Sequence, residues 1–222
     1  MFPLLRIANQ IRIPENNDWV IFILLGCAFL YVFMMVSLLR DSTVKDFILQ
    51  EYSDAGNGLG SWIIVGFVFC ITFSVMISQY IPIVPEPFAK IGLAGYQLNK
   101  FGFTFIAVLL FYLSKSLAGY LFFQFTGNGK HWPVFYFTGT RYFFAASLIL
   151  MILCVAHYFF PIDHHIVFPY YVAGVAAAFI FKVLYYLLHR NRILPEEWYY
   201  KFLYICTLQI VPAIALWNLL FF

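Results

Sequence analysis

A lysine with hydroxyl neighbours interrupts a long apolar stretch of this 222-residue sequence. Lys115 lies between Ser114 and Ser116 in FYLSKSLAGYLF, residues 111–122. An ammonium group at membrane depth costs about 2.5 to 3.5 kcal/mol on insertion scales, so it is expected to bind an anion or several hydrogen-bond acceptors. A lipid phosphate, an anionic substrate or an acidic side chain of another subunit would each provide the missing partner.

Two further cations are predicted in the same half of the membrane as Lys115. At 1.5 Å per residue, Lys115 lies about 15 Å and Lys182 about 10 Å from the ends of their predicted helices. Because both helices end at the same membrane face, these lysines and Arg141 are expected to converge. Gln79 and Gln209 are polar side chains expected in the same interior. The five residues form the predicted site for an anion, a lipid or a partner protein.

A purely structural role is the alternative for each cation. The side chain of Lys182 is long enough to snorkel to the interface, and Arg141 can simply mark the start of its helix. Lys115 can be satisfied by helix carbonyls, by its serine neighbours, or by Gln79 or Gln209 within the bundle. The sequence alone leaves both roles open.

Carboxylates are absent from the interiors of the predicted spans. Proton-coupled and sodium-coupled transporters usually hold an Asp or Glu within the bundle, so this pattern argues against a stand-alone cation-coupled carrier. It is compatible with an acid supplied by a partner subunit. The ten acidic residues lie in connections or at span edges: Glu15, Asp18, Asp41, Asp46, Glu51, Asp54, Glu86, Asp163, Glu196 and Glu197.

A histidine-rich turn is the second group of residues that could do chemistry. His157, Asp163, His164 and His165 crowd the segment HYFFPIDHHIVFP, and such side chains can bind zinc or iron. The segment lacks HExxH and the repeated histidine boxes of di-iron enzymes, so a polar turn at the interface is favoured and metal binding is the weaker alternative. GxSxG is also absent. No catalytic residue, cofactor or nucleic-acid partner is predicted.

Composition places these residues in a membrane protein. Hydrophobic residues make up 64% of the chain and charged residues only 10%, against roughly a quarter in soluble proteins. A helix needs about 20 apolar residues to cross a bilayer, and uniformly apolar runs of that length exclude barrel strands. The sequence therefore predicts an all-α polytopic bundle with about six spans: 19–39, 61–81, about 101–125, about 141–160, 170–188 and 198–222.

The segments outside the spans are short. Residues 1–18 are expected to form a polar arm at the membrane surface, followed by a single transmembrane helical domain over 19–222. Residues 80–100, between the second and third spans, are too proline-rich to cross the membrane, so an interfacial segment is predicted, with a re-entrant helix as the alternative. Pro212 is expected to kink the last span and to expose carbonyls near Gln209.

The last forty residues carry a recognisable pattern, YxCxLxIxP, after a short basic and aromatic loop. Its residues are Tyr204, Cys206, Leu208, Ile210 and Pro212. This pattern resembles an integral-membrane family of Bacteroidota, the domain of unknown function 4271. The resemblance implies an inner-membrane location in a Gram-negative envelope, no catalytic residue, and an acid in the position that Gln209 holds here.

Three functions follow as hypotheses from this sequence. The first is a non-enzymatic inner-membrane subunit or accessory protein of an envelope complex, in secretion, motility or lipid and lipoprotein handling, with membrane lipids and other membrane proteins as partners. The second is a small transporter or anionic-headgroup binder that uses Lys115 and Lys182. The third is a membrane metalloenzyme acting through the region from His157 to His165.

Overall fold

The structure is a computed structural model that describes residues 18–39, 43–49, 52, 58–81, 99–160, 164–188, 194 and 197–221, with the side chains of residues 164 and 165 excepted. Six of its helices are long and apolar enough to cross a membrane. No strand occurs in the described ranges. The predicted all-α polytopic bundle is therefore confirmed, and the chain is a multi-pass membrane protein.

Two of the six spans combine α-helical and π-helical segments. The first joins α1, Asp18–Phe33, to a π-helix over Met34–Leu38, and the last joins α8, Trp198–Leu203, to a π-helix over Tyr204–Ile210 and then α9, Val211–Phe221. The other four spans are α3, Gly58–Ser78; α5, Lys100–Phe125; α6, Trp132–Phe159, which follows a 3₁₀ turn over Gly129–His131; and α7, His164–Leu188. A short helix outside the spans, α2, covers Val44–Leu49.

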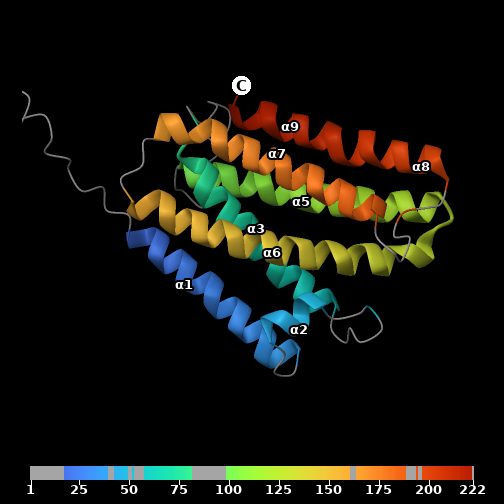
Figure 1. Ribbon diagram of the computed structural model, residues 1–222, viewed down its shortest axis with the longest axis horizontal. Coiled ribbons are helices and arrows are strands. Elements are labelled where there is room, and N and C mark those ends of the chain that lie inside the picture. Colours follow the sequence, from blue (N-terminus) through green and yellow to red (C-terminus); the bar gives the residue numbers. More distant parts are fainter. Residues whose placement is uncertain are drawn as a thin grey trace, which may run out of the picture.

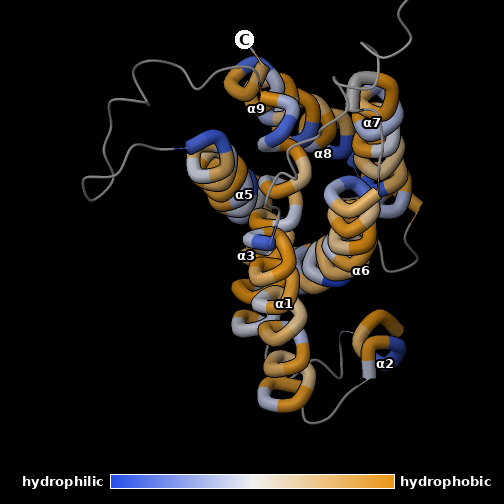
Figure 2. The backbone as a smooth tube through the Cα atoms, turned by 90° about the vertical axis from the view of Figure 1, so that its left-hand side faces the viewer, coloured by the Kyte–Doolittle hydropathy of each residue, from blue (hydrophilic) through white to orange (hydrophobic). Residues whose placement is uncertain are grey.

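Helix α3 is the central element of the bundle. It packs between α5 and α6 and also contacts α1, and half of its residues are buried. Figure 1 shows α5, α6, α7 and the last span running roughly side by side, with α1 and α3 oblique to them, and the view along the bundle in Figure 2 places α1 on one side of α3 and α9 on the other. Only 11% of the residues in the α7 span are buried, the smallest share among the six. Helix α7 is therefore the most open surface of the bundle.

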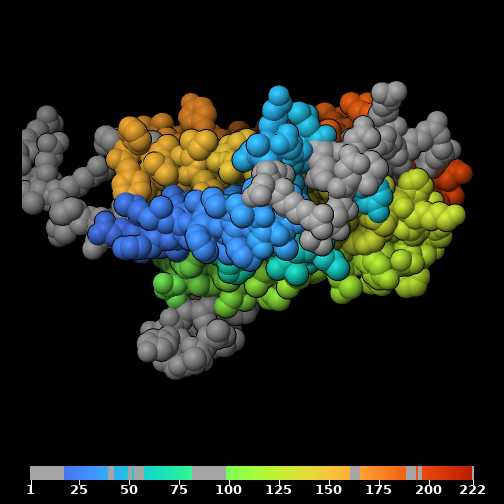
Figure 3. Space-filling view, turned by 90° about the horizontal axis from the view of Figure 1, so that it is seen from below, coloured from blue at the N-terminus to red at the C-terminus, as the bar shows by residue number. Residues whose placement is uncertain are grey.

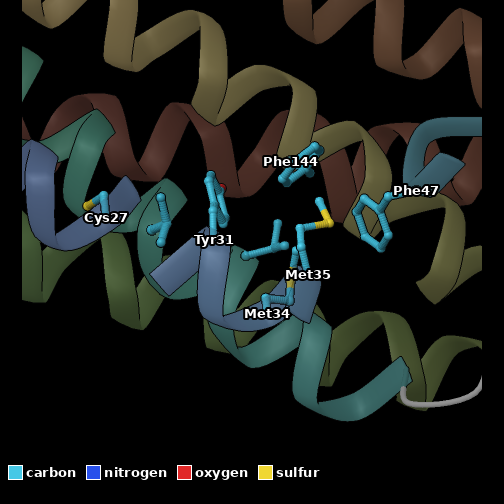
Figure 4. Packing of buried hydrophobic residues seen from close by; sticks show 8 residues of the cluster. Cys27, Tyr31, Met34, Met35, Phe47 and Phe144 are labelled. Carbon is cyan, nitrogen blue, oxygen red and sulfur yellow. The ribbon is translucent and has the colours of Figure 1, made fainter. Parts of the chain in front are cut away.

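Aromatic packing attaches α1 and α2 to α6. The Phe144 ring contacts the rings of Tyr31 and Phe47 at centroid distances of 4.8 and 5.0 Å (Figure 4). The Tyr31 hydroxyl also forms a hydrogen bond with Ser147 Oγ on α6. In the space-filling view of Figure 3, α1 lies along α6, with α2 beside it. These contacts hold the first connection against the bundle.

Helix α2 begins with a reciprocal cap. The backbone N–H and hydroxyl of Thr43 donate to Asp46 Oδ2 at 3.1 and 2.6 Å, and the Asp46 N–H donates to Thr43 Oγ1 at 3.2 Å. This is the capping-box arrangement, with Asp in the place usually held by Glu or Gln. The same bonds from Thr43 hold the pKa of the Asp46 carboxyl below its ordinary value.

The start of α6 differs from the prediction. The helix begins at Trp132, whereas the sequence pattern predicted a start near Arg141. Pro133 suits the first turn of a helix because its missing N–H has no partner there in any case. The prediction was wrong because aromatic residues were assigned to an interfacial belt instead of to the helix. Arg141 consequently lies inside the span.

Pro212 produces a change of helix type directly before it. The π-helix ends at Ile210, and Pro212 is the second residue of α9. A proline cannot donate to the carbonyl four residues earlier, so the helix loses little by widening at this point. Residues 1–17 of the arm predicted for 1–18, and residues 82–98 of the interfacial segment predicted for 80–100, lie outside the described residues.

Gly66 makes the close packing of α3 on α5 possible. A Cβ atom at this position would lie 2.6 Å from Tyr112 Cε1 and 2.8 Å from its hydroxyl oxygen. We expect Gly66→Ala to lower the free energy of unfolding by about 1 to 3 kcal/mol, because the ring must move within a packed interior. Unfolding in detergent micelles by titration with sodium dodecyl sulfate measures this.

Gly26→Ala is the matched control for this substitution. Gly26 also lies within a span, but no atom is found within 4 Å of its added Cβ. Alanine there should be neutral or should stabilise the helix by up to about 1 kcal/mol. Equal effects of the two substitutions would contradict the packing described for Gly66.

Candidate functional site

Lys115 is bound by a glutamine from the last span. Its ammonium nitrogen donates to Gln209 Oε1 at 2.5 Å, and Gln209 Nε2 donates in turn to the Tyr204 hydroxyl. Both acceptor residues are buried, and Gln209 is 0% exposed. This chain of bonds links α5 to the π-helix. Gln209 was one of the partners considered for Lys115 from the sequence.

The π-helix explains how Gln209 and Tyr204 come together. The two residues are five positions apart, and a π-helix brings positions i and i+5 into register. In an α-helix, residues three and four apart share a face. The wide turn before Pro212 therefore orients the Gln209 amide between Tyr204 and the lysine.

Lys182 is surrounded by aromatic rings. It is 6% exposed, and its Nζ lies 4.0 Å from the Phe143 ring centroid, 5.4 Å from that of Tyr142 and 5.6 Å from that of Tyr186. Ring faces attract cations through their quadrupole. No oxygen among the described residues accepts a hydrogen bond from this ammonium group. The side chain thus lies inside the bundle and does not snorkel to the interface.

Lys115 contacts the helix that carries Lys182. Lys115 Nζ lies 5.6 Å from the ring centroid of Phe179, which is on α7 one turn before Lys182. Residues three apart share a helix face, so this contact brings Lys115 to the part of α7 that carries the second lysine. Like charges repel more strongly in the apolar interior of a protein than in water. The pair therefore favours an anion in its vicinity.

Two tyrosines that the sequence reasoning missed lie on the same helices as the lysines. Tyr112 precedes Lys115 by one helical turn on α5, and Tyr186 follows Lys182 by one turn on α7. The Tyr112 hydroxyl is buried and has no partner in the described part of the chain. A signal existed in the spacing, because residues three and four apart share a helix face.

Arg141 is directed to a different part of the bundle. Its Nε donates to the Phe47 carbonyl oxygen of α2 at 3.0 Å, and its guanidinium carbon lies 4.5 Å from the Phe137 ring centroid. One terminal nitrogen, Nη2, is buried without a partner among the described residues. Arg141 thus attaches α2 to α6, and the two residues that it contacts are not among those that contact Lys115 or Lys182.

Gln79 binds a histidine and not a lysine. Its Oε1 lies 2.7 Å from His157 Nε2, and the Tyr171 hydroxyl lies 3.3 Å from His157 Nδ1. A neutral imidazole protonated on Nε2 satisfies both contacts. Within the described residues no three His, Cys, Asp or Glu side chains are placed to hold a metal ion. Asp163 and the side chains of His164 and His165 lie outside the described part.

Comparison with known families identifies the chain. The sequence profile of the family described as "Domain of unknown function (DUF4271)" matches residues 19–220. The chain belongs to this family. The match covers all six spans, whereas the resemblance in the sequence rested on the last forty residues. No curated protein and no solved structure matches the chain.

The contribution of Gln209 to the stability of this DUF4271 member can be tested by substitution. Gln209→Leu leaves the Lys115 ammonium without its acceptor, so we expect a loss of about 2 to 4 kcal/mol in the free energy of unfolding. Lys115→Met in the same chain should recover most of this loss, because the unpaired charge is then gone. A double-mutant cycle in micelles measures the coupling.

Gln124→Leu is the control, because Gln124 is exposed near the end of α5. Its effect should stay within about 0.5 kcal/mol. Additive effects of Gln209→Leu and Lys115→Met would show that the bond between these residues does not stabilise the bundle.

Proposed function

We propose that this protein is a non-enzymatic membrane protein that binds an anionic group between α5, α7 and the last span. One observation carries the proposal: Lys182, which is buried, and Lys115, which is half-buried, place two cations beside the same turn of α7, with Lys115 Nζ 5.6 Å from the Phe179 ring centroid. In the described spans the one carboxylate is Asp18, at the first residue of α1. The described chain therefore offers the pair no acid.

The energetics support an anionic ligand. Each buried ammonium group costs about 2.5 to 3.5 kcal/mol on insertion scales, and a cation over a ring recovers at most about 2 kcal/mol when desolvated. The mutual repulsion of the lysines adds to this cost. An anion between them offsets all of these terms, since it attracts both ammonium groups in a medium of low dielectric constant.

The test is purification in mild detergent followed by mass spectrometry of everything that the protein retains. We expect the wild-type protein to keep a stoichiometric anionic lipid or small molecule. Lys115→Met and Lys182→Met should each release it and stay folded, because methionine is an apolar side chain of similar length.

Lys130→Met, at an exposed position in the turn before α6, should retain the anionic group like the wild type. A wild-type protein that carries no anion, together with lysine variants of unchanged or higher stability, would overturn the proposal. Gln209 and the ring faces would then satisfy the lysines by themselves.

A subunit of an envelope complex is the second candidate, and the openness of α7 favours it. Six consecutive residues of this helix, Ala173 to Ala178, are exposed, and no atom lies within 4 Å of a Cβ added at Gly174. Small residues let a second transmembrane helix approach closely. On this proposal another membrane protein covers α7.

Gly174→Leu distinguishes the two candidates. The substitution meets no neighbour within this chain, so the protein should fold normally. A partner helix on α7 should be lost from the purified complex, whereas a bound anion should remain. Gly26→Leu, at an exposed position of α1 with equal free space, is the control. Absence of a stoichiometric protein partner from the wild-type preparation would contradict the subunit proposal.

The inner membrane of a Gram-negative envelope is the proposed location. A bundle of apolar α-helices and the resemblance of the last span to proteins of Bacteroidota support it. Fractionation of inner and outer membranes from the native cell tests it directly.

A further inference from the structure

We infer that the anionic group is a phosphate monoester, and that the hydroxyls of Tyr112 and Tyr186 select it by donating hydrogen bonds to its oxygens. This inference rests on the proposed anion site and adds the chemical class of its ligand. The site also gains two specificity-determining residues that lie outside the lysine pair.

The contacts place both hydroxyl-bearing rings beside the lysines. The Phe143 ring lies against the Tyr112 ring at 5.4 Å between centroids, and the Lys182 ammonium group lies over the same Phe143 ring at 4.0 Å. The Tyr186 ring centroid lies 5.6 Å from Lys182 Nζ and 6.5 Å from the ring centroid of Tyr204, which belongs to the Gln209 network. The lysines and the two tyrosines thus form one group inside the bundle.

Two glycines admit the tyrosine hydroxyls. A Cβ at Gly139 of α6 would lie 2.9 Å from the Tyr186 hydroxyl oxygen, and one at Gly66 of α3 would lie 2.8 Å from that of Tyr112. Each contact is shorter than side chains tolerate, so any larger residue would displace a hydroxyl. The Tyr112 hydroxyl is also buried without an acceptor among the described residues, and a phenol in this state is stabilised by a ligand that accepts its hydrogen bond.

The donors outnumber what a carboxylate can accept. Lys115 donates one of its three N–H groups to Gln209. No described group accepts a hydrogen bond from Lys182, Tyr112 or Tyr186. Within the described residues, five ammonium N–H groups and the buried Tyr112 hydroxyl are therefore left without an acceptor. A carboxylate offers about four lone-pair sites on two oxygens, whereas a phosphate monoester offers three strongly accepting oxygens. The donor set fits the phosphate.

The charge leads to the same ligand. Two adjacent ammonium groups are neutralised by about two negative charges. A phosphate monoester carries about −1.5 to −2 at pH 7, whereas a carboxylate, a halide or the phosphodiester of an ordinary phospholipid carries −1. A lipid with a terminal phosphate and a water-soluble phosphate share this chemistry.

The experiment titrates the purified, delipidated full-length protein with inorganic phosphate and with acetate, using the thermal unfolding midpoint as the readout of binding. Phosphate should bind at least about tenfold more tightly than acetate. Tyr112→Phe and Tyr186→Phe should each weaken phosphate binding about tenfold, because a hydroxyl donor to a charged oxygen is lost. Tyr170→Phe, at an exposed position of α7, should change neither affinity.

Lipid nanodiscs identify the source of the phosphate. Phosphatidate in the bilayer should stabilise the protein more than phosphatidylglycerol does if the ligand is a lipid. Inorganic phosphate should stabilise it in either bilayer if the ligand is water-soluble. Either result supports a phosphate monoester, provided that Tyr112→Phe and Tyr186→Phe each reduce the stabilisation.

Two other outcomes are distinguishable. Equal binding of acetate and phosphate, unchanged in both tyrosine variants but lost in Lys115→Met, would overturn the phosphate inference and leave the anion site intact. No stabilisation by any of these probes, with wild-type and Lys182→Met proteins behaving alike, would overturn the anion site as well.

Discussion

The hydrogen bond from Lys115 to Gln209 is the interaction on which the interior of this bundle depends. It places a cation from α5 and an amide from the last span in one network, which continues to the Tyr204 hydroxyl. Water is excluded from such an interior, so polar groups must find partners within the protein or in a ligand. The π-helix therefore orients the buried glutamine that accepts the hydrogen bond of the lysine.

Ring faces, and not carboxylates, lie against the lysine ammonium groups in the described spans. The Phe143 ring supports the ammonium group of Lys182, and the rings of Phe111 and Phe179 flank that of Lys115. A ring face attracts a cation without carrying a formal charge, so it leaves the lysine free to attract a mobile anion. A permanent carboxylate would instead have fixed the local charge balance. This arrangement suits the proposed site, where an anionic ligand would bind reversibly.

Hydropathy was sufficient to predict the six spans, because runs of about 20 apolar residues have few alternatives in a bilayer. Helix direction alone also led to the prediction that Lys115 and Lys182 converge. The sequence did not distinguish Gln209 from Gln79 as the partner of Lys115, since that choice depends on how distant helices pack. Tyr112 and Tyr186 were missed because tyrosines in an aromatic-rich membrane protein were interpreted as interfacial or lipid-facing side chains. The start of α6 was missed for a similar reason, and the unexpected π-helix reflects a proline that sequence rules associate with a kink.

The π-helix also depends on the number of residues in the last span. A π turn holds about one residue more than an α turn, which advances by about 100° per residue. A homologous chain one residue shorter between Trp198 and Pro212 would regain a regular helix. Because the π turn accommodates the extra residue, the faces of α8 and α9 would keep nearly the same relative orientation in such a chain. Within this family, we therefore expect a gap of one residue in this span to mark the loss of the π turn, with α9 presenting the same face to α5.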